Sequence, residues 1–130
     1  MTPVQSGGKT IDQNYLLNQN NQFRSKEGLG PASWNQAEFC SARCSVKRCT
    51  NFPTDKAHDS GPYSQNIAWV DYGQQQFYEE KSNSGCTMHN IDACGHYVNM
   101  MTQSTVGCNF QSCTGKGTMN GGYEMRCNYN

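Results

Sequence analysis

Eight cysteines in 130 residues are the feature that most restricts how this chain can fold. Leu, Ile, Val and Phe together contribute only 16 residues, fewer than folding by aliphatic burial alone normally requires. Disulfides stabilise by roughly 2 to 4 kcal/mol each, so four bridges would match the net stability of a typical domain. We therefore expect one disulfide-stapled domain over residues 1–130, with residues 1–9 as a loosely ordered N-terminal arm.

The same cysteine usage predicts an oxidising compartment, and hence a secreted, extracellular protein. Residues 1–10 contain no apolar run, so we expect that a signal peptide has been removed and that Met1 is an expression residue. No stretch approaches the roughly 20 apolar residues of a transmembrane span. Ten basic and ten acidic residues are interspersed, which argues against nucleic acid as a partner.

Three helices are indicated by spacing and capping signals. Apolar residues at helical spacing predict a helix over residues 11–24, with Gly28 as its stop. Asn35 is placed to cap a second helix that runs through Cys40 and Cys44. Asp71 is placed to cap a third helix over residues 72–81.

The strand signals lie in the second half of the chain. Residues 66–70, "NIAWV", predict a short buried strand, and residues 106–111 and 123–129 alternate as two amphipathic strands. The turn-rich segment between the last two predicts an antiparallel hairpin in which Cys108 faces Cys127, so we predict that bridge. Cys86 and Cys94 enclose a short loop and form a second natural pair. Spacing leaves the connectivity of the other four cysteines open.

The three histidines differ in their surroundings. His89 lies between Cys86 and Cys94, where a solvated side chain is the default. His58 and His96 each lie close to glycine, proline or cysteine residues that restrict the backbone. Two histidines so far apart in sequence do not by themselves establish a metal site, however. A zinc site of three cysteines with His58 is disfavoured, because the spacing is unusual and the even cysteine total suits disulfides. The three cysteines of that alternative are Cys40, Cys44 and Cys49.

Seven segments of this chain match the pattern of one known family, in family order. They are "LNQNNQFR", "GPASW", "HDSGPYSQNIA", "FYEEKSNSGC", "CGHY", "VGC" and the terminal "CNY". On these segments the chain resembles the CAP superfamily: cysteine-rich secretory proteins, antigen 5 and plant pathogenesis-related proteins, with their SCP domain. The helices, strands and hairpin above already predict an α+β fold whose helices cover an antiparallel sheet. The resemblance implies a three-layer α-β-α sandwich and secretion. It also supports both predicted bridges and suggests that Cys113 reaches back to residues 40–49, which makes Cys49–Cys113 and Cys40–Cys44 the expected remaining pairs.

The resemblance further implies a surface cleft lined by two histidines and two glutamates. The histidines map onto His58 and His96, while Gln65 stands in place of the first glutamate. Counting back from the helical tyrosine of "FYEEK" places Gln74 at the second glutamate, although an insertion would bring Glu79 or Glu80 there instead. The expected cleft is therefore His58, Gln65, Gln74 and His96, without a carboxylate.

The expected replacement of both family glutamates by glutamine determines which functions we expect. Glutamine does not titrate, so it cannot serve as a general acid or base, and two imidazoles alone, His58 and His96, would bind zinc weakly. We expect a secreted, non-enzymatic binding domain that requires no cofactor and recognises an extracellular protein or, as the resemblance implies, a sterol or fatty acid. A metal-assisted hydrolase that uses the two histidines and a structural protein of an extracellular matrix are the alternatives.

Overall fold

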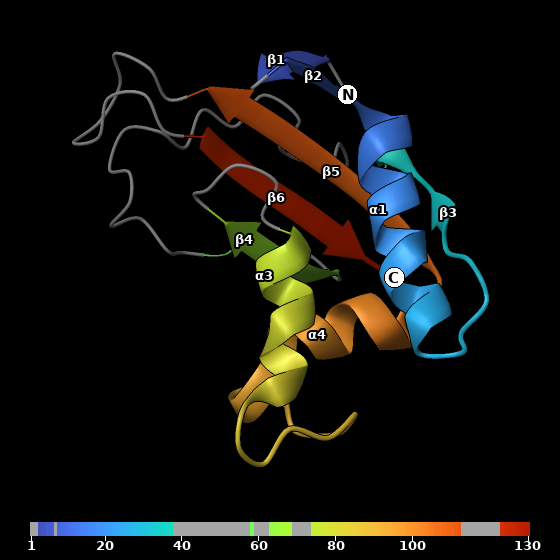
Figure 1. Cartoon of the computed structure of the whole chain (residues 1–130), viewed down its shortest axis with the longest axis vertical. Helices are drawn as coiled ribbons and strands as arrows, with labels where there is room; N and C mark the ends of the chain where they lie inside the picture. Colours follow the sequence, from blue (N-terminus) through green and yellow to red (C-terminus); the bar gives the residue numbers. More distant parts are fainter. Residues whose placement is uncertain (1–2, 7, 38–57, 59–62, 69–73, 113–122) are drawn as a thin grey trace.

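The computed structural model describes residues 3–6, 8–37, 58, 63–68, 74–112 and 123–130. Its centre is a four-stranded sheet in the order β3-β5-β6-β4 (Figure 1). The strands are β3 (Ser33–Trp34), β4 (Ser64–Ala68), β5 (Thr105–Ser112) and β6 (Tyr123–Tyr129). The hairpin of β5 and β6 is confirmed, with Cys108 opposite Cys127, and β4 pairs antiparallel with β6.

The sheet is mixed, not purely antiparallel as expected, because β3 runs parallel to β5. This edge strand has only two residues, too few for an alternating pattern to announce it. It is held to β5 by the Asn35 N–H, which donates to the Val106 carbonyl at 2.9 Å. A Cβ at Gly107 would lie 2.2 Å from the Asn35 carbonyl oxygen, so the close approach requires glycine.

The first helix, α1 (Gln13–Lys26), begins two residues later than predicted and ends two later. Asp12 caps it by accepting from the Tyr15 N–H at 2.9 Å. At its end the Leu29 N–H reaches back to the Arg24 carbonyl and Gly28 adopts a φ of +74°, the arrangement of a Schellman motif. Gly28 thus acts as the predicted stop.

The other helices are α3 (Gln74–Glu79), the 3-10 turn η2 (Glu80–Ser82) and α4 (Ile91–Thr102). The predicted third helix is therefore present but tightens into η2 at its end, and α4 was not predicted. Asn35 caps the start of the predicted second helix, since its Oδ1 accepts from the Ala37 N–H at 3.1 Å. The rest of that helix, including Cys40 and Cys44, lies outside the described residues, as does Asp71.

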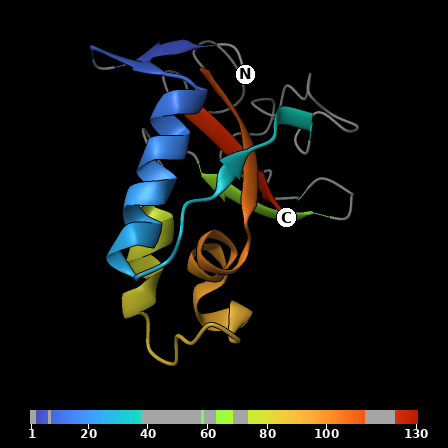
Figure 2. The ribbon, with the colours of Figure 1, turned by 90° about the vertical axis from the view of Figure 1, so that its right-hand side faces the viewer.

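Helices α1, α3 and α4 pack against one another on one side of the sheet. Figure 2 shows the teal segment after β3 emerging on the opposite side of β5 from α1. The predicted α+β class is confirmed. None of the helices in the described part of the chain has the length and apolar character needed to cross a lipid bilayer.

Within residues 1–9, for which a loosely ordered arm was expected, the described residues include strand segments. β1 (Val4–Ser6) and β2 (Lys9–Ile11) form an antiparallel hairpin with Gly8 at a φ of +76° in its turn. Ile11 is fully buried in the core, and this burial anchors the hairpin. These strands were not predicted, because an isolated apolar residue next to a helix gives no strand signal.

The core combines few aliphatic side chains with sulfur-containing and aromatic ones. Its fully buried members are Ile11, Met100, Cys108, Met125 and Cys127. Strand β6 was predicted to be amphipathic, yet its alternate polar residues Glu124, Arg126 and Asn128 are also buried. A central strand covered on both faces explains this difference.

Both bridges predicted from the residues are present. Cys86–Cys94 and Cys108–Cys127 have Cα–Cα separations of 5.5 and 4.1 Å. None of the four cysteines in the described part of the chain is a free thiol. The expected pairs Cys40–Cys44 and Cys49–Cys113 lie outside the described residues.

Candidate functional site

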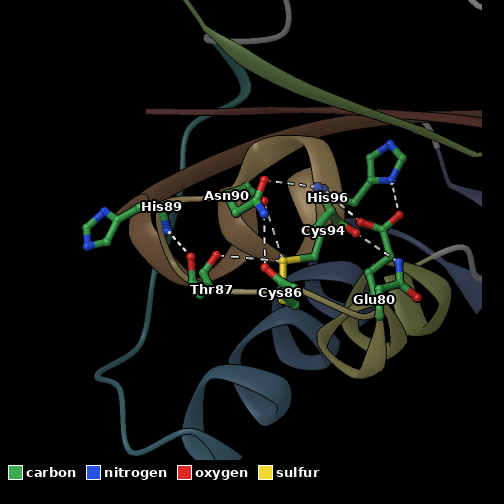
Figure 3. The surroundings of a disulfide bond; sticks show 10 residues. Glu80, Cys86, Thr87, His89, Asn90, Cys94 and His96 are labelled. Atoms are coloured by element: carbon green, nitrogen blue, oxygen red, sulfur yellow. Dashed lines mark hydrogen bonds and ion pairs between the residues drawn. A yellow bond between two sulfur atoms is a disulfide. The ribbon is translucent and has the colours of Figure 1, made fainter.

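A break in α4 at Cys94 places His96 at the start of a new helical segment. The Asn90 side chain caps the first turn by accepting from the Ala93 N–H at 3.3 Å, and Cys94 then leaves the helical conformation at φ −155° and ψ 48°. The bridge to Cys86 anchors Cys94 at this break (Figure 3). A second helical segment therefore starts at Gly95, and His96 lies in its first turn.

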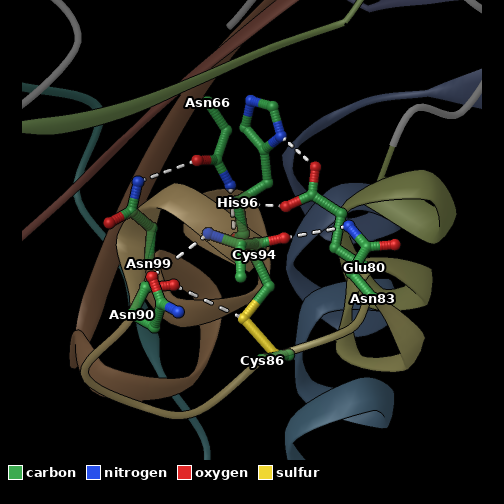
Figure 4. Close-up of polar contacts among 9 residues, drawn as sticks. Asn66, Glu80, Asn83, Cys86, Asn90, Cys94, His96 and Asn99 are labelled. Atoms are coloured by element: carbon green, nitrogen blue, oxygen red, sulfur yellow. Dashed lines mark hydrogen bonds and ion pairs between the residues drawn. A yellow bond between two sulfur atoms is a disulfide. The ribbon is translucent and has the colours of Figure 1, made fainter.

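Glu80 caps that second segment. One carboxylate oxygen accepts from the His96 backbone N–H at 3.0 Å, and the other lies 2.5 Å from the His96 ring Nδ1. A carboxylate at a helix N-terminus is stabilised by the unpaired N–H groups and the helix dipole. Because a carboxylate only accepts, the Nδ1 atom carries the hydrogen, and Figure 4 shows the second ring nitrogen pointing away from Glu80.

Three further contacts hold His96 or its surroundings. The buried Asn66 side chain on β4 donates to the His96 carbonyl at 2.9 Å and accepts from Asn99 at 2.9 Å (Figure 4). The Phe77 ring of α3 stacks on the imidazole with centroids 4.8 Å apart. The His96 side chain keeps 37% of its surface exposed, so the ring is fixed yet accessible.

His58 is exposed and lies beside Gln65 of β4. Its Nδ1 is 3.3 Å from the Gln65 Oε1, and the Gln65 Nε2 donates to the Asn128 Oδ1 at 2.8 Å. Gln65 is also 3.4 Å from the Nη1 of Arg126, which pairs with Glu124 at 2.5 Å. A row of buried polar residues therefore ends at His58.

Both histidines line one cleft of about 380 Å³. Gln65 and Glu80 line it with them, and the remaining lining residues are Asn83, Ile91, Asp92, Ala93, Gly95 and Asn99. An adjoining hollow of about 340 Å³ shares His58 and Gln65 and adds Tyr63 and Ser64. Three of the four expected cleft residues are thus brought together.

The expectation for Gln74 is wrong. Its side chain is fully buried against α1, where it donates to the Leu16 carbonyl at 2.9 Å and to Gln19 at 3.0 Å. Glu80, one of the two alternatives, faces the cleft because the chain turns from α3 into η2 before it. The cleft is therefore not free of acids, since Glu80 and Asp92 both line it.

The donor set for a metal is incomplete in the described part of the chain. No group of three or more His, Cys, Asp or Glu side chains there is arranged to hold an ion. Both carboxylate oxygens of Glu80 already contact His96. The cleft residue beside His58 is Gln65, an amide without charge. Within the described residues, a divalent cation such as zinc would therefore find too few ligands for a complete site.

His89 has no part in the cleft. Its backbone N–H contacts the Thr87 hydroxyl at 3.3 Å, and its exposed ring points away from the Cys86–Cys94 bridge (Figure 3). This agrees with the expected solvated side chain.

No protein-family model matches the chain. Pathogenesis-related protein 1B of Nicotiana tabacum is 28% identical over 141 residues, which cover 95% of this chain and 77% of that protein. Pathogenesis-related protein 1 of Arabidopsis thaliana is 29% identical over 126 residues, covering 90% and 74%. The chain is a distant homologue of plant pathogenesis-related protein 1.

This chain matches the solved structure of MpPR-1i soaked with selenourea with a TM-score of 0.67. The identity is 22%, and the match covers 92% of this chain and 94% of that one. At this identity the likeness shows the fold alone, which is the fold of MpPR-1i. Two residues that hold His96 in place were not singled out from the sequence. Asn66 lies within the matched segment "HDSGPYSQNIA", whereas Asn99 lies outside the seven matched segments.

Proposed function

We propose that this homologue is a secreted, non-enzymatic binding domain that takes a polar ligand, presented by an extracellular protein, in the His58 and His96 cleft. The proposal rests mainly on Gln65, which lines the cleft and places an amide where the resembled family has a glutamate. An amide neither titrates nor carries charge, so it cannot exchange a proton with a substrate. Glu80, the carboxylate on the other side, already accepts twice from His96.

The lining of the cleft favours a polar ligand over a sterol or fatty acid. Of the residues that line the 380 Å³ cleft, seven have polar or charged side chains, and Ile91 is the single large apolar one. An apolar ligand there would displace water from imidazole, amide and carboxylate groups and offer them no hydrogen bond in return, at roughly 1–3 kcal/mol for each group left uncompensated. Hydrogen-bonding groups of a protein surface would satisfy them.

Secretion is supported by the homology and by the bridges, because disulfides persist in oxidising compartments. A role in defence is suggested by the names of the pathogenesis-related relatives.

Metal-assisted hydrolysis is the second candidate, and one observation favours it. Glu80 fixes the His96 ring so that its Nε2 keeps a lone pair, as metal-binding histidines require. A two-histidine site without a second free carboxylate would still bind the ion weakly.

Zinc titration by calorimetry separates the two candidates. The binding-domain proposal expects dissociation constants above the micromolar range for the wild type and little change in His58→Ala or His96→Ala. Sub-micromolar affinity that either substitution abolishes, with His89→Ala as the unchanged control, would favour the hydrolase instead.

Lipid binding is tested separately with cholesterol and palmitate. We expect that neither lipid saturates the protein at micromolar concentration and that Ile91→Asn leaves the result unchanged. Saturable binding that is lost on Ile91→Asn would mean that the cleft accepts an apolar ligand and would refute the polar assignment.

A further inference from the structure

Arg126 lies on β6 outside the cleft, yet it determines which way Gln65 presents its amide. Arginine has donors only, so the Gln65 atom 3.4 Å from its Nη1 must be the oxygen. The Gln65 nitrogen then faces the Asn128 Oδ1, to which it donates at 2.8 Å. This network fixes the orientation of the Gln65 amide.

The orientation of Gln65 decides the tautomer of His58. The same Gln65 oxygen lies 3.3 Å from the His58 Nδ1, and an amide oxygen only accepts. Nδ1 must therefore carry the hydrogen. A neutral His58 then keeps its lone pair on Nε2.

His96 arrives at the same tautomer by an independent route, because its Nδ1 faces a Glu80 carboxylate oxygen. We propose that Arg126 is a positioning residue that acts through Gln65 to hold His58 as the Nδ1–H tautomer, matching His96. Glu124 supports this role by pairing with Arg126 at 2.5 Å, with both side chains buried. The inference concerns the protein without ligand, so it stands or falls separately from the proposed function.

Nitrogen-15 NMR of the imidazoles in the full chain at pH 8 tests the assignment, because neutral histidines report their protonated nitrogen directly. We expect His58 and His96 to be predominantly Nδ1–H. His89, with its exposed ring, should show mainly the Nε2–H form that an unrestrained histidine side chain prefers. A predominantly Nε2–H His58 in the wild type would overturn the proposal.

The double variant Glu124→Leu with Arg126→Met tests the part played by Arg126. Replacing both members of a buried ion pair by apolar residues is often tolerated, whereas removing one strands the other. Gln65 then loses the donor that fixes its oxygen, so His58 should shift toward Nε2–H while His96 stays Nδ1–H as an internal control. An unchanged His58 in the folded double variant would contradict the role of Arg126.

Gln65→Met covers the case in which the double variant does not fold. This substitution removes the acceptor at the cleft surface and leaves the Glu124 and Arg126 pair in place. His58 should then resemble His89, with His96 unaffected. A His58 that keeps the Nδ1–H form without Gln65 would show that the amide does not set the tautomer.

Discussion

His96 is held by contacts from three elements of the fold. Its N–H and Nδ1 contact Glu80 of η2, its carbonyl accepts from Asn66 of β4, and its ring stacks on Phe77 of α3. The bridge at Cys94 anchors the backbone two residues earlier. A histidine restrained in this way loses little further freedom when it meets a ligand.

Glu80→Ala should therefore destabilise the protein. The substitution removes a helix-capping carboxylate and leaves the His96 N–H without its acceptor, so we expect a loss of about 1 to 2 kcal/mol in the free energy of unfolding. Urea unfolding at neutral pH measures it. Glu79→Ala is the matched control, because Glu79 is exposed and contacts Gln75 only at the surface. Equal losses in the two variants would contradict the capping role.

At the scale of elements, Arg24 joins the ends of α1 and α4. Its Nη1 donates to the carbonyls of Met100 at 2.9 Å and Gln103 at 2.9 Å, and its Nε donates to Gly30 at 2.8 Å. Positive charge at the end of α4 also complements the helix dipole. Burial lowers the pKa of Arg24, but a guanidinium remains charged at any physiological pH.

Arg24→Met should loosen this junction. The C-terminal carbonyls of α4 would lose a charged donor in a buried setting, at a cost of about 3 kcal/mol. Lys26→Met makes the same kind of change two residues away on α1, where the Lys26 side chain is exposed and lies over the Phe23 and Tyr78 rings. That control should cost less than about 1 kcal/mol. Thermal or urea unfolding of the pair gives the comparison, and similar costs would refute the junction.

At the scale of the whole molecule, the Cys108–Cys127 bridge joins the two central strands within a core of few aliphatic side chains. Both cysteines are fully buried and 19 residues apart in sequence. Replacing both by Ala should destabilise by about 3 kcal/mol, since a loop of this length is no longer closed in the unfolded chain. Urea unfolding measures the loss. A loss below about 1 kcal/mol would mean that apolar burial dominates instead.

Alkaline pH should also destabilise the protein. Burial raises the pKa of Tyr129, so its phenol stays neutral in the folded state while the unfolded chain ionises near pH 10. A group whose folded pKa is raised contributes stability below its unfolded pKa and loses it above. Stability should therefore fall above about pH 10 by roughly 1.4 kcal/mol per pH unit from this group. Tyr129→Phe should flatten the decline measured by urea unfolding between pH 9 and 11, and an unchanged slope would assign it to other groups.

Local chemistry was sufficient for several elements, whereas the three cleft residues were predicted from the family resemblance. The Gly28 stop, the Asn35 cap and the C-terminal hairpin each depend on residues close together in sequence, so their signals are readable without the fold. Helix α4 was not predicted, although its buried residues Cys94, Tyr97, Val98 and Met101 fall at helical spacing. The two-residue strand β3 was missed because it has no period at all.

The sequence by itself determined the α+β class and two disulfides, since these follow from short-range patterns. It also indicated His58, Gln65 and His96 as cleft residues through the family resemblance. Only the tertiary structure decided that Glu80, and not Gln74, faces His96. Six residues turn roughly 240° around a helix, so the two side chains leave on different faces. Which face meets the cleft depends on how α3 packs against α1, and that packing is set by contacts distant in sequence.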